Sequence, residues 1–283
     1  MCRRLGALLL AAGLVLAALP AVAAPPHGDF TGGVPGAPGK TWIDLLSQIF
    51  PDIAASSEGE ADAGEMNDVR SIGSGDDSWV KCGDKIHFRS HDARPVRLAG
   101  RDYMVVTVTI EDECVGLIGL FDGSGKLIDA VNVRGDIHVS FSGDYVRPLG
   151  AGGALVIAHN WHDNSEQSYD ADALILVKPD GFSAIGNVLA FGARGCGENG
   201  KPGELLLEQS KVRVAPNGDP LARIEVTVTR SLQKLAADDC NRTLGQPVST
   251  IFTGSWRWNA EKNAYEAYAP ALDSLSKWNE KRF

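Results

Sequence analysis

The 283-residue sequence predicts an all-β protein, an antiparallel meander or β-sandwich-like domain with one short helix near each end of the chain. Two observations support this fold class. Apolar and polar residues alternate with a period of two along several segments, which is typical of strands that bury one face. Clusters of Gly, Asn and Asp separate the apolar segments, and these residues provide the tight turns that hairpins need.

Residues 1–23 have the pattern of a secretory signal peptide. Two arginines precede an apolar run over 5–19, and a small-x-small tripeptide ending at Ala23 forms a cleavage site. The run is shorter than the roughly 20 residues that a membrane span needs, and no later stretch is apolar for long enough. We therefore expect a periplasmic or secreted protein without stable membrane insertion after cleavage.

Residues 24–78 are expected to form a flexible leader, which is rich in Pro and Gly at first and acidic from about residue 56. A short helix is expected within it over 41–50, because Trp42, Leu45, Leu46 and Ile49 recur on one side and a proline follows. The packed β domain is expected to span residues 79–283.

Strands are predicted through most of this domain. The alternation is clearest over 104–110 and 224–228, where it places an apolar set and a more polar set on opposite faces. Further strands are expected near 116–121, 137–141, 154–159, 173–177 and 250–258, with hairpin turns at 122–125, 179–181, 216–219 and 259–263 and a helix over 271–281. The uneven spacing of the turns favours a sandwich over the alternative, a small irregular β-propeller, whose blades repeat regularly.

Four cysteines follow the signal peptide, and an even number in an exported chain indicates disulfides. Four cysteines allow three pairings. We favour Cys82 with Cys114 and Cys196 with Cys240, since each pair closes a loop within one half of the chain. The chain-entropy model gives about 4 kcal/mol for each closure. The chain lacks a CxxC pair, so we expect no metal site at these cysteines.

The formal charge of the chain is −9, which argues against nucleic acids and anionic membrane surfaces as partners. A GxGxxG pattern occurs at 195–200, but it contains a cysteine of an expected disulfide and no helix is expected after it. We therefore expect no nucleotide or other cofactor. Neither GxSxG nor HExxH occurs, and no catalytic residue is identified from sequence.

The segment 159–170 contains the densest group of polar and aromatic residues in the chain. The candidate ligand-binding residues are His159, Trp161, His162, Asp163, Asn164 and Tyr169. In a strand His159 and Trp161 point to one side and His162 to the other, so both histidines could bind one metal only if the strand ends before residue 162. The alternative interpretation is an Asx-rich connection with aromatic side chains packed at the end of the sheet.

These features predict an exported, non-enzymatic β protein that binds a small ligand or an envelope protein through loops at one end of the sheet. The alternative is an extracytoplasmic hydrolase, metal-assisted in one version, centred on the 159–170 loop with His159, His162 and Asp163 near the reacting atoms. A third hypothesis is that the acidic arm over 56–77 tethers the protein to an envelope partner.

Overall fold

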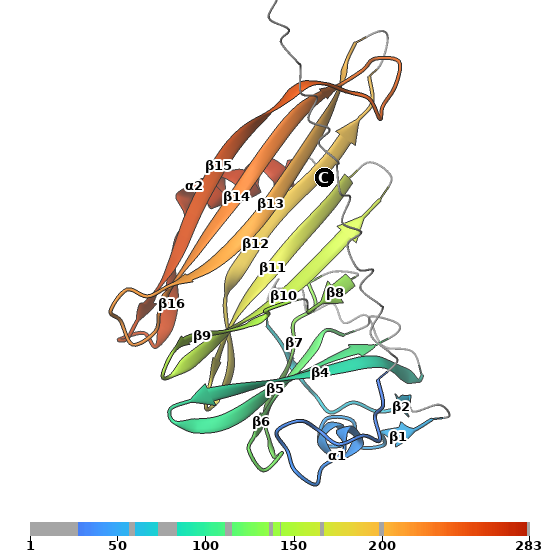
Figure 1. The fold of residues 1–283 in the computed structure, drawn as a ribbon, viewed down its shortest axis with the longest axis vertical. Coiled ribbons are helices and arrows are strands. Elements are labelled where there is room, and N and C mark those ends of the chain that lie inside the picture. Colours follow the sequence, from blue (N-terminus) through green and yellow to red (C-terminus); the bar gives the residue numbers. More distant parts are fainter. Residues whose placement is uncertain are drawn as a thin grey trace, which may run out of the picture.

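The computed structural model describes residues 28–56, 60–72, 84–110, 115–135, 138–141, 143–164, 167–197 and 201–281. Most of these residues lie in strands, which form two sheets with one short helix near each end of the chain (Figure 1). The all-β prediction with two short helices is therefore confirmed. The two sheets match the sandwich-like prediction better than the propeller alternative.

The smaller sheet has seven strands in the described part of the chain. Its order is β1-β2-β4-β5-β6-β7-β3, and β3 joins β7 in parallel while the other neighbours are antiparallel. The strands are β1 (Ala54–Ala55), β2 (Ala61–Ala63), β3 (Arg70–Ser71), β4 (Ile86–Leu98), β5 (Arg101–Ile110), β6 (Leu117–Asp122) and β7 (Leu127–Asn132).

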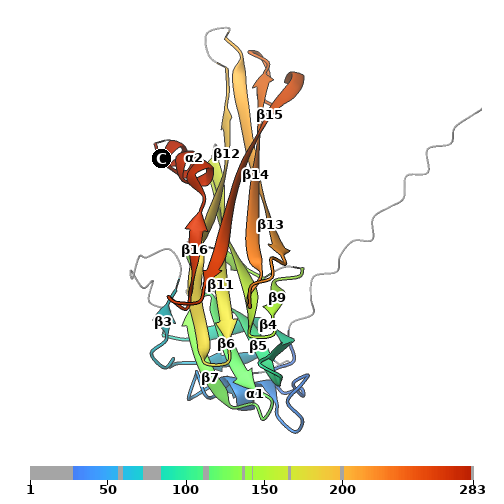
Figure 2. The same ribbon diagram turned by 90° about the vertical axis from the view of Figure 1, so that its left-hand side faces the viewer.

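The larger sheet is an antiparallel meander from β10 to β16, with β8 and β9 both paired to β10. Its long strands extend away from the smaller sheet (Figures 1 and 2). The predicted hairpin turns lie where consecutive strands connect. The strands are β8 (His138–Ser140), β9 (Val146–Gly150), β10 (Gly153–Asp163), β11 (Gln167–Lys178), β12 (Gly181–Gly195), β13 (Gly203–Ala215), β14 (Arg223–Leu235), β15 (Thr243–Asn259) and β16 (Ala264–Tyr268).

Strand β5 is buried on both faces, which differs from the predicted alternation of a buried and a more polar face. Met104 and Val106 pack into a core with the N-terminal segment, whereas Val105 packs into a second core that the larger sheet covers. Thr107, from the set expected to be more polar, is also buried. The second sheet is the reason, because it covers the face that the sequence pattern leaves open.

The N-terminal segment is part of the packed fold, in contrast to the flexible leader that its composition suggested. Phe30, Leu45 and Phe50 are fully buried against the smaller sheet. The helix α1 (Trp42–Leu46) begins with a capping box in which the Thr41 side chain accepts from the Asp44 N–H. Its Trp42 ring stacks on His91 of β4 at 3.8 Å between centroids. Apolar residues spaced between the Pro and Gly turns supply enough buried surface to order this segment.

The acidic stretch that follows is also ordered in its described part, residues 60–72. Asp52 accepts from the backbone N–H groups of Gly64 and Glu65, and Asp62 on β2 pairs with Lys85 and His87. Asp62 of this stretch thus has local partners, and Asp52, which precedes the stretch, fixes its backbone at Gly64 and Glu65, so residues 62–65 do not behave as a solvated linker. The remainder of the leader and the expected domain start at residue 79 lie outside the described residues, as do 1–23.

A third core fills the space between the larger sheet and the C-terminal helix α2 (Pro270–Glu280). Leu275 and Trp256 belong to it, and Leu272 packs against it. Gly254 of β15 permits the close approach of the helix, since a Cβ there would lie 2.6 Å from Leu272 Cδ1. The predicted helix over 271–281 is confirmed with nearly the same bounds.

A buried polar group fixes the end of α2 to the sheet. The carboxylate of Glu208 on β13 accepts from the Asn279 side chain at 2.9 Å, from the Phe191 N–H at 3.0 Å and from Arg230 at 2.8 Å. The Arg230 guanidinium in turn lies 3.7 Å above the Trp278 ring. Helix packing here therefore depends on one satisfied buried carboxylate as well as on apolar contacts.

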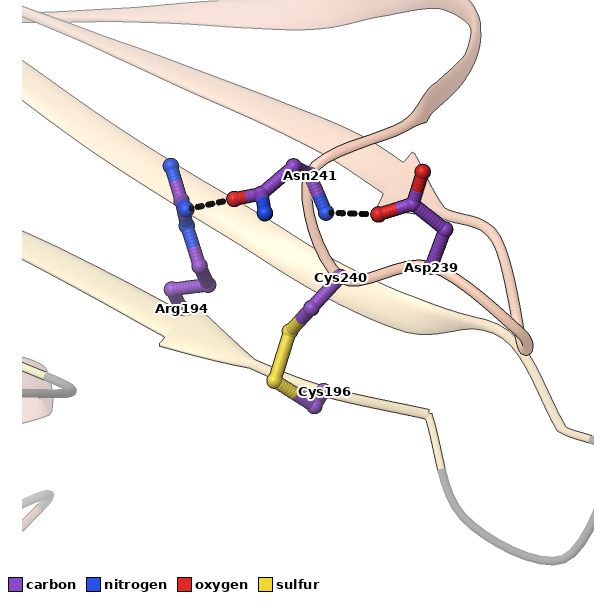
Figure 3. The surroundings of a disulfide bond; sticks show 5 residues. All are labelled: Arg194, Cys196, Asp239, Cys240 and Asn241. Carbon is purple, nitrogen blue, oxygen red and sulfur yellow. Dashed lines mark hydrogen bonds between the residues drawn. A yellow bond between two sulfur atoms is a disulfide. The ribbon is translucent and has the colours of Figure 1, made fainter.

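The disulfide between Cys196 and Cys240 joins the end of β12 to the connection between β14 and β15 (Figure 3). The two Cα atoms are 5.1 Å apart. Beside it, Arg194 donates to the Asn241 side chain at 2.6 Å. This confirms one favoured pairing, whereas Cys82 and Cys114 lie outside the described residues.

Candidate functional site

The β10–β11 hairpin carries all six candidate residues. Strand β10 continues to Asp163, and the register pairs His159 with Asp172, Trp161 with Asp170 and His162 with Tyr169. Since side chains alternate along a strand, His159 and Trp161 project from one face and His162 from the other. The hairpin therefore divides the candidate residues between two faces of the sheet, and the two histidines are not placed to share a ligand.

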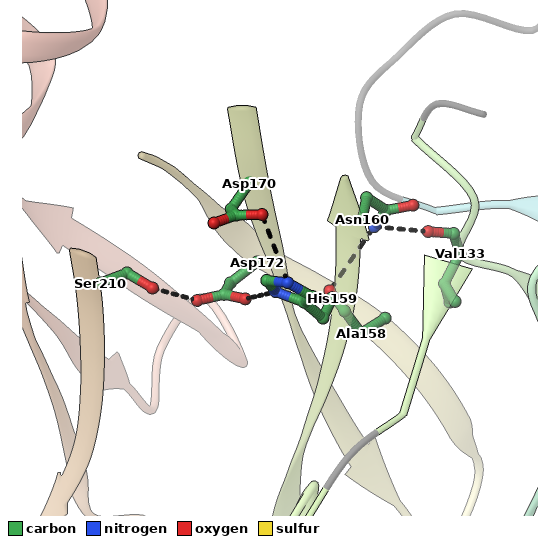
Figure 4. Close-up of polar contacts among 7 residues, drawn as sticks. All are labelled: Val133, Ala158, His159, Asn160, Asp170, Asp172 and Ser210. Carbon is green, nitrogen blue, oxygen red and sulfur yellow. Dashed lines mark hydrogen bonds and ion pairs between the residues drawn. The ribbon is translucent and has the colours of Figure 1, made fainter. Parts of the chain in front are cut away.

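On the first face, His159 lies between two aspartates (Figure 4). Its Nε2 is 3.4 Å from Asp170 Oδ1, and its Nδ1 is 2.8 Å from Asp172 Oδ1. The second oxygen of Asp172 accepts from the Ser210 hydroxyl of β13 at 2.6 Å. The contacts with Asp170 and Asp172 raise the pKa of His159 to about 10, from an ordinary value of 6.5. The side chain is therefore an imidazolium at neutral pH.

His159, Asp172 and Ser210 of this cluster line a groove of about 400 Å³, here called the His159 groove. Its polar lining residues are Asp144, Tyr145, Arg147, His159, Asp172 and Ser210, and Lys211 also borders it. Arg147 spans from β9 to β13, donating to the backbone carbonyl oxygens of Val212 at 2.7 Å and Asp144 at 3.0 Å. Burial raises the pKa of the Tyr145 phenol to about 12, so it remains a neutral donor. The volume falls within the roughly 300–1,000 Å³ of small-molecule sites.

The geometry of the cluster differs from that of a nucleophile activated by histidine. In such a site the serine hydroxyl bonds to the imidazole, and the aspartate orients that imidazole from its far side. Here Ser210 donates to Asp172, and both ring nitrogens of His159 face carboxylates. A doubly protonated ring cannot accept a proton or coordinate a metal. Across the described residues, no three His, Cys, Asp or Glu side chains converge as metal ligands.

Of the remaining candidate residues, His162 and Tyr169 lie against each other, whereas Trp161 and Asn164 have partners outside the candidate set. Trp161 stacks on His138 of β8 at 4.1 Å between centroids, and His162 lies parallel to the Tyr169 ring at 5.8 Å. Tyr169 also borders a separate cavity of about 270 Å³ beside the buried Asn160. At the hairpin end, the Asn164 side chain accepts from the Gln167 N–H at 2.9 Å, as the Asx-rich interpretation expects.

The sequence prediction thus placed one residue, His159, in the groove and missed its partners. Asp170 is the last residue of the 159–170 segment and Asp172 lies two residues beyond it. The two aspartates alternate with alanines, a pattern that could have indicated a polar strand face. Arg147 and Ser210 come from strands far away in sequence, and no local signal connects them to His159. Trp161, His162, Asp163 and Asn164 border neither this groove nor the Tyr169 cavity.

Comparison with protein-family models, with curated proteins and with solved structures gives no match. Neither helix in the described part of the chain has the length and apolar character needed to cross a membrane. A functional proposal for this chain therefore depends on the chemistry of the groove.

Proposed function

We propose that this chain is an exported binding protein that holds a small, uncharged, polyhydroxylated ligand, such as a saccharide, in the His159 groove. The signal-peptide pattern of residues 1–23, which lie outside the described residues, supports export. The disulfide between Cys196 and Cys240 supports it as well, because such bonds persist mainly in oxidising compartments.

The balance of charges in the groove supports a neutral ligand. The lining includes Arg147, His159 and Lys211 on the cationic side and Asp144 and Asp172 on the anionic side, and Asp170 adds a carboxylate behind His159. Neither sign of charge dominates, so a strongly charged ligand gains little electrostatic free energy by binding in the groove. Hydroxyl groups can both donate to carboxylates and accept from a guanidinium or imidazolium, which suits this mixture. Ile157 contributes apolar surface to the same groove.

The state of His159 favours binding over hydrolysis. A general base must accept a proton near neutral pH, whereas His159 lies in contact with two carboxylates that keep it protonated. The alternative of a metal-assisted hydrolase built on His159, His162 and Asp163 has less support, because the first two project from opposite faces of β10.

Binding can be tested by titration calorimetry of the mature protein against a panel of soluble saccharides. We expect saturable binding that weakens when Asp144, at the groove, is changed to Asn. The matched control is Asp163→Asn at the end of the hairpin, outside the groove, which should leave affinity unchanged. Equal affinities in both variants, or sustained turnover of a panel substrate, would contradict the proposal.

A further inference from the structure

The outer strand β15 has one long unpaired side. It pairs with β14 from Thr243 to Trp256, but β16 covers its other side only from Ser255 onward. Among the described strands, none pairs with residues 243–254 on that side. Figure 1 shows β15 along the outside of the larger sheet, with β16 beside its lower part only. An open edge presents backbone N–H and C=O groups to which another strand can bond.

Proteins usually protect such edges with charged side chains, prolines or bulges, and β15 has this protection at its two ends only. At one end the register shifts between Leu232 and Lys234, next to Pro247. At the other end Tyr268 of β16 pairs with Ser255. The seven residues between these limits, Val248–Gly254, carry no charge, and four of them are β-branched.

The open run also exposes apolar side chains. Val248 and Ile251 are 69% and 65% exposed, more than any other large aliphatic residue that the structure describes. They project from opposite faces of the strand, so a neighbouring strand would cover part of both. Leu207, 47% exposed, belongs to the same face as Ile251, because it pairs across β14 with Ser249.

We propose that the run Val248–Gly254 is a dimerisation edge, at which a second copy of this chain adds its own β15 in antiparallel orientation. A two-fold axis normal to the sheet pairs Ile251 with Ile251 of the second copy and Val248 with Gly254. The sheets of both copies then become continuous. Because the run is uncharged, two copies of this acidic chain can meet there without placing like charges on opposite strands.

The two limits of the run are complementary under the same two-fold axis. On each copy, β16 begins to cover β15 at the pair of Ser255 and Tyr268. In the proposed register Ser255 of one copy lies opposite Pro247 of the other, next to the bulge of that strand. Proline cannot donate a ladder hydrogen bond, and a bulge bends its strand, so the incoming chain leaves the edge there. Ile251 is the middle residue of the open run, so the open runs of two copies can pair over their full length in antiparallel orientation.

The test is sedimentation velocity of the mature protein over a wide range of concentration. We expect a concentration-dependent dimer that Ile251→Lys converts to a monomer, since two ammonium groups then face each other at the axis. The control, Leu207→Lys, adds the same charge to the same face two strands from the edge and should leave the dimer intact. Far-UV circular dichroism and melting curves establish that both variants are folded.

A second variant, Ile251→Cys, reports the register directly. Side chains directly opposite in an antiparallel pair have Cβ atoms about 5 Å apart, so a short thiol cross-linker should join the two copies. The same cross-linker should leave Leu207→Cys unjoined. A monomer at every concentration, an equal response of the two lysine variants, or no cross-linking through residue 251 would overturn the proposal.

Discussion

His159 of β10 stands directly opposite Asp172 of β11, and the His159 Nδ1 lies 2.8 Å from Asp172 Oδ1. Asp172 also holds the Ser210 hydroxyl of β13, so one carboxylate connects three strands of the larger sheet. The protonation of His159 therefore affects the stability of that sheet. Its consequences can be measured as pH-dependent stability.

The first prediction concerns stability at alkaline pH. The pKa of His159 is about 10 in the folded chain against 6.5 ordinarily, so the folded state binds its proton more tightly. The resulting stabilisation is complete below pH 6.5 and is lost as the pH rises through 10. Melting curves of the wild type and His159→Gln should therefore differ most at acidic pH and converge above 10. A constant difference across that range would contradict the pairing.

The second prediction concerns acidic pH and His91. Burial between Phe30 and Trp42 lowers the pKa of His91, so the unfolded chain takes up a proton that the folded chain resists. Stability should consequently fall as the pH drops below 6.5. His91→Phe keeps an aromatic ring in the stack and should reduce this loss. Urea unfolding at several pH values measures this loss of stability. If the free energy of unfolding depends on pH in the same way in the wild type and in His91→Phe, the lowered pKa of His91 is refuted.

The third prediction concerns the disulfide. Cys196 and Cys240 are 44 residues apart, for which the chain-entropy model gives about 4 kcal/mol of stabilisation. The double variant Cys196→Ala with Cys240→Ala should lower the free energy of unfolding by about that amount, as measured by urea titration without reductant. A loss below about 1 kcal/mol would mean that strand pairing alone holds this end of the sheet.

The fourth prediction concerns the carboxylate beneath α2. Glu208 is fully buried and bonded to Arg230, so Glu208→Ala leaves a buried guanidinium without its counter-charge. The expected cost is about 3–5 kcal/mol in the free energy of unfolding. The matched control is Glu204→Ala on the same strand, whose partner Lys234 is exposed, at about 0–1 kcal/mol. Similar losses in the two variants would contradict the anchoring role.

The sequence predicted strands where one face is apolar, and it failed where burial depends on distant partners. The alternation of Ile224, Val226 and Val228 correctly indicated β14, since this strand is buried on one side. In β13 the pattern is interrupted by Glu208 and Ser210 on the inner face. Their side chains bond to Arg230 and Asp172, which are remote in sequence. The local sequence of β13 therefore lacks the apolar period that would have predicted the strand.

Composition was misleading at the N-terminus for a similar reason. Pro and Gly between residues 30 and 40 suggested flexibility, yet Gly36 and Gly39 adopt positive φ values of 87° and 76° that shape a packed loop. Whether such a loop is ordered depends on the apolar surface that receives it. That surface is the face of β4 and β5, which the sequence of the loop does not contain.

The charge of His159 is the property on which the proposed binding site depends, and NMR of its imidazole nitrogens measures that charge directly. We predict that both ring nitrogens remain protonated through pH 8 and that the ring titrates near pH 10. Asp172→Asn should move this transition toward neutral pH. A wild-type His159 that titrates near its ordinary pKa of 6.5 would contradict the account, because the ring would then be free to act as a base.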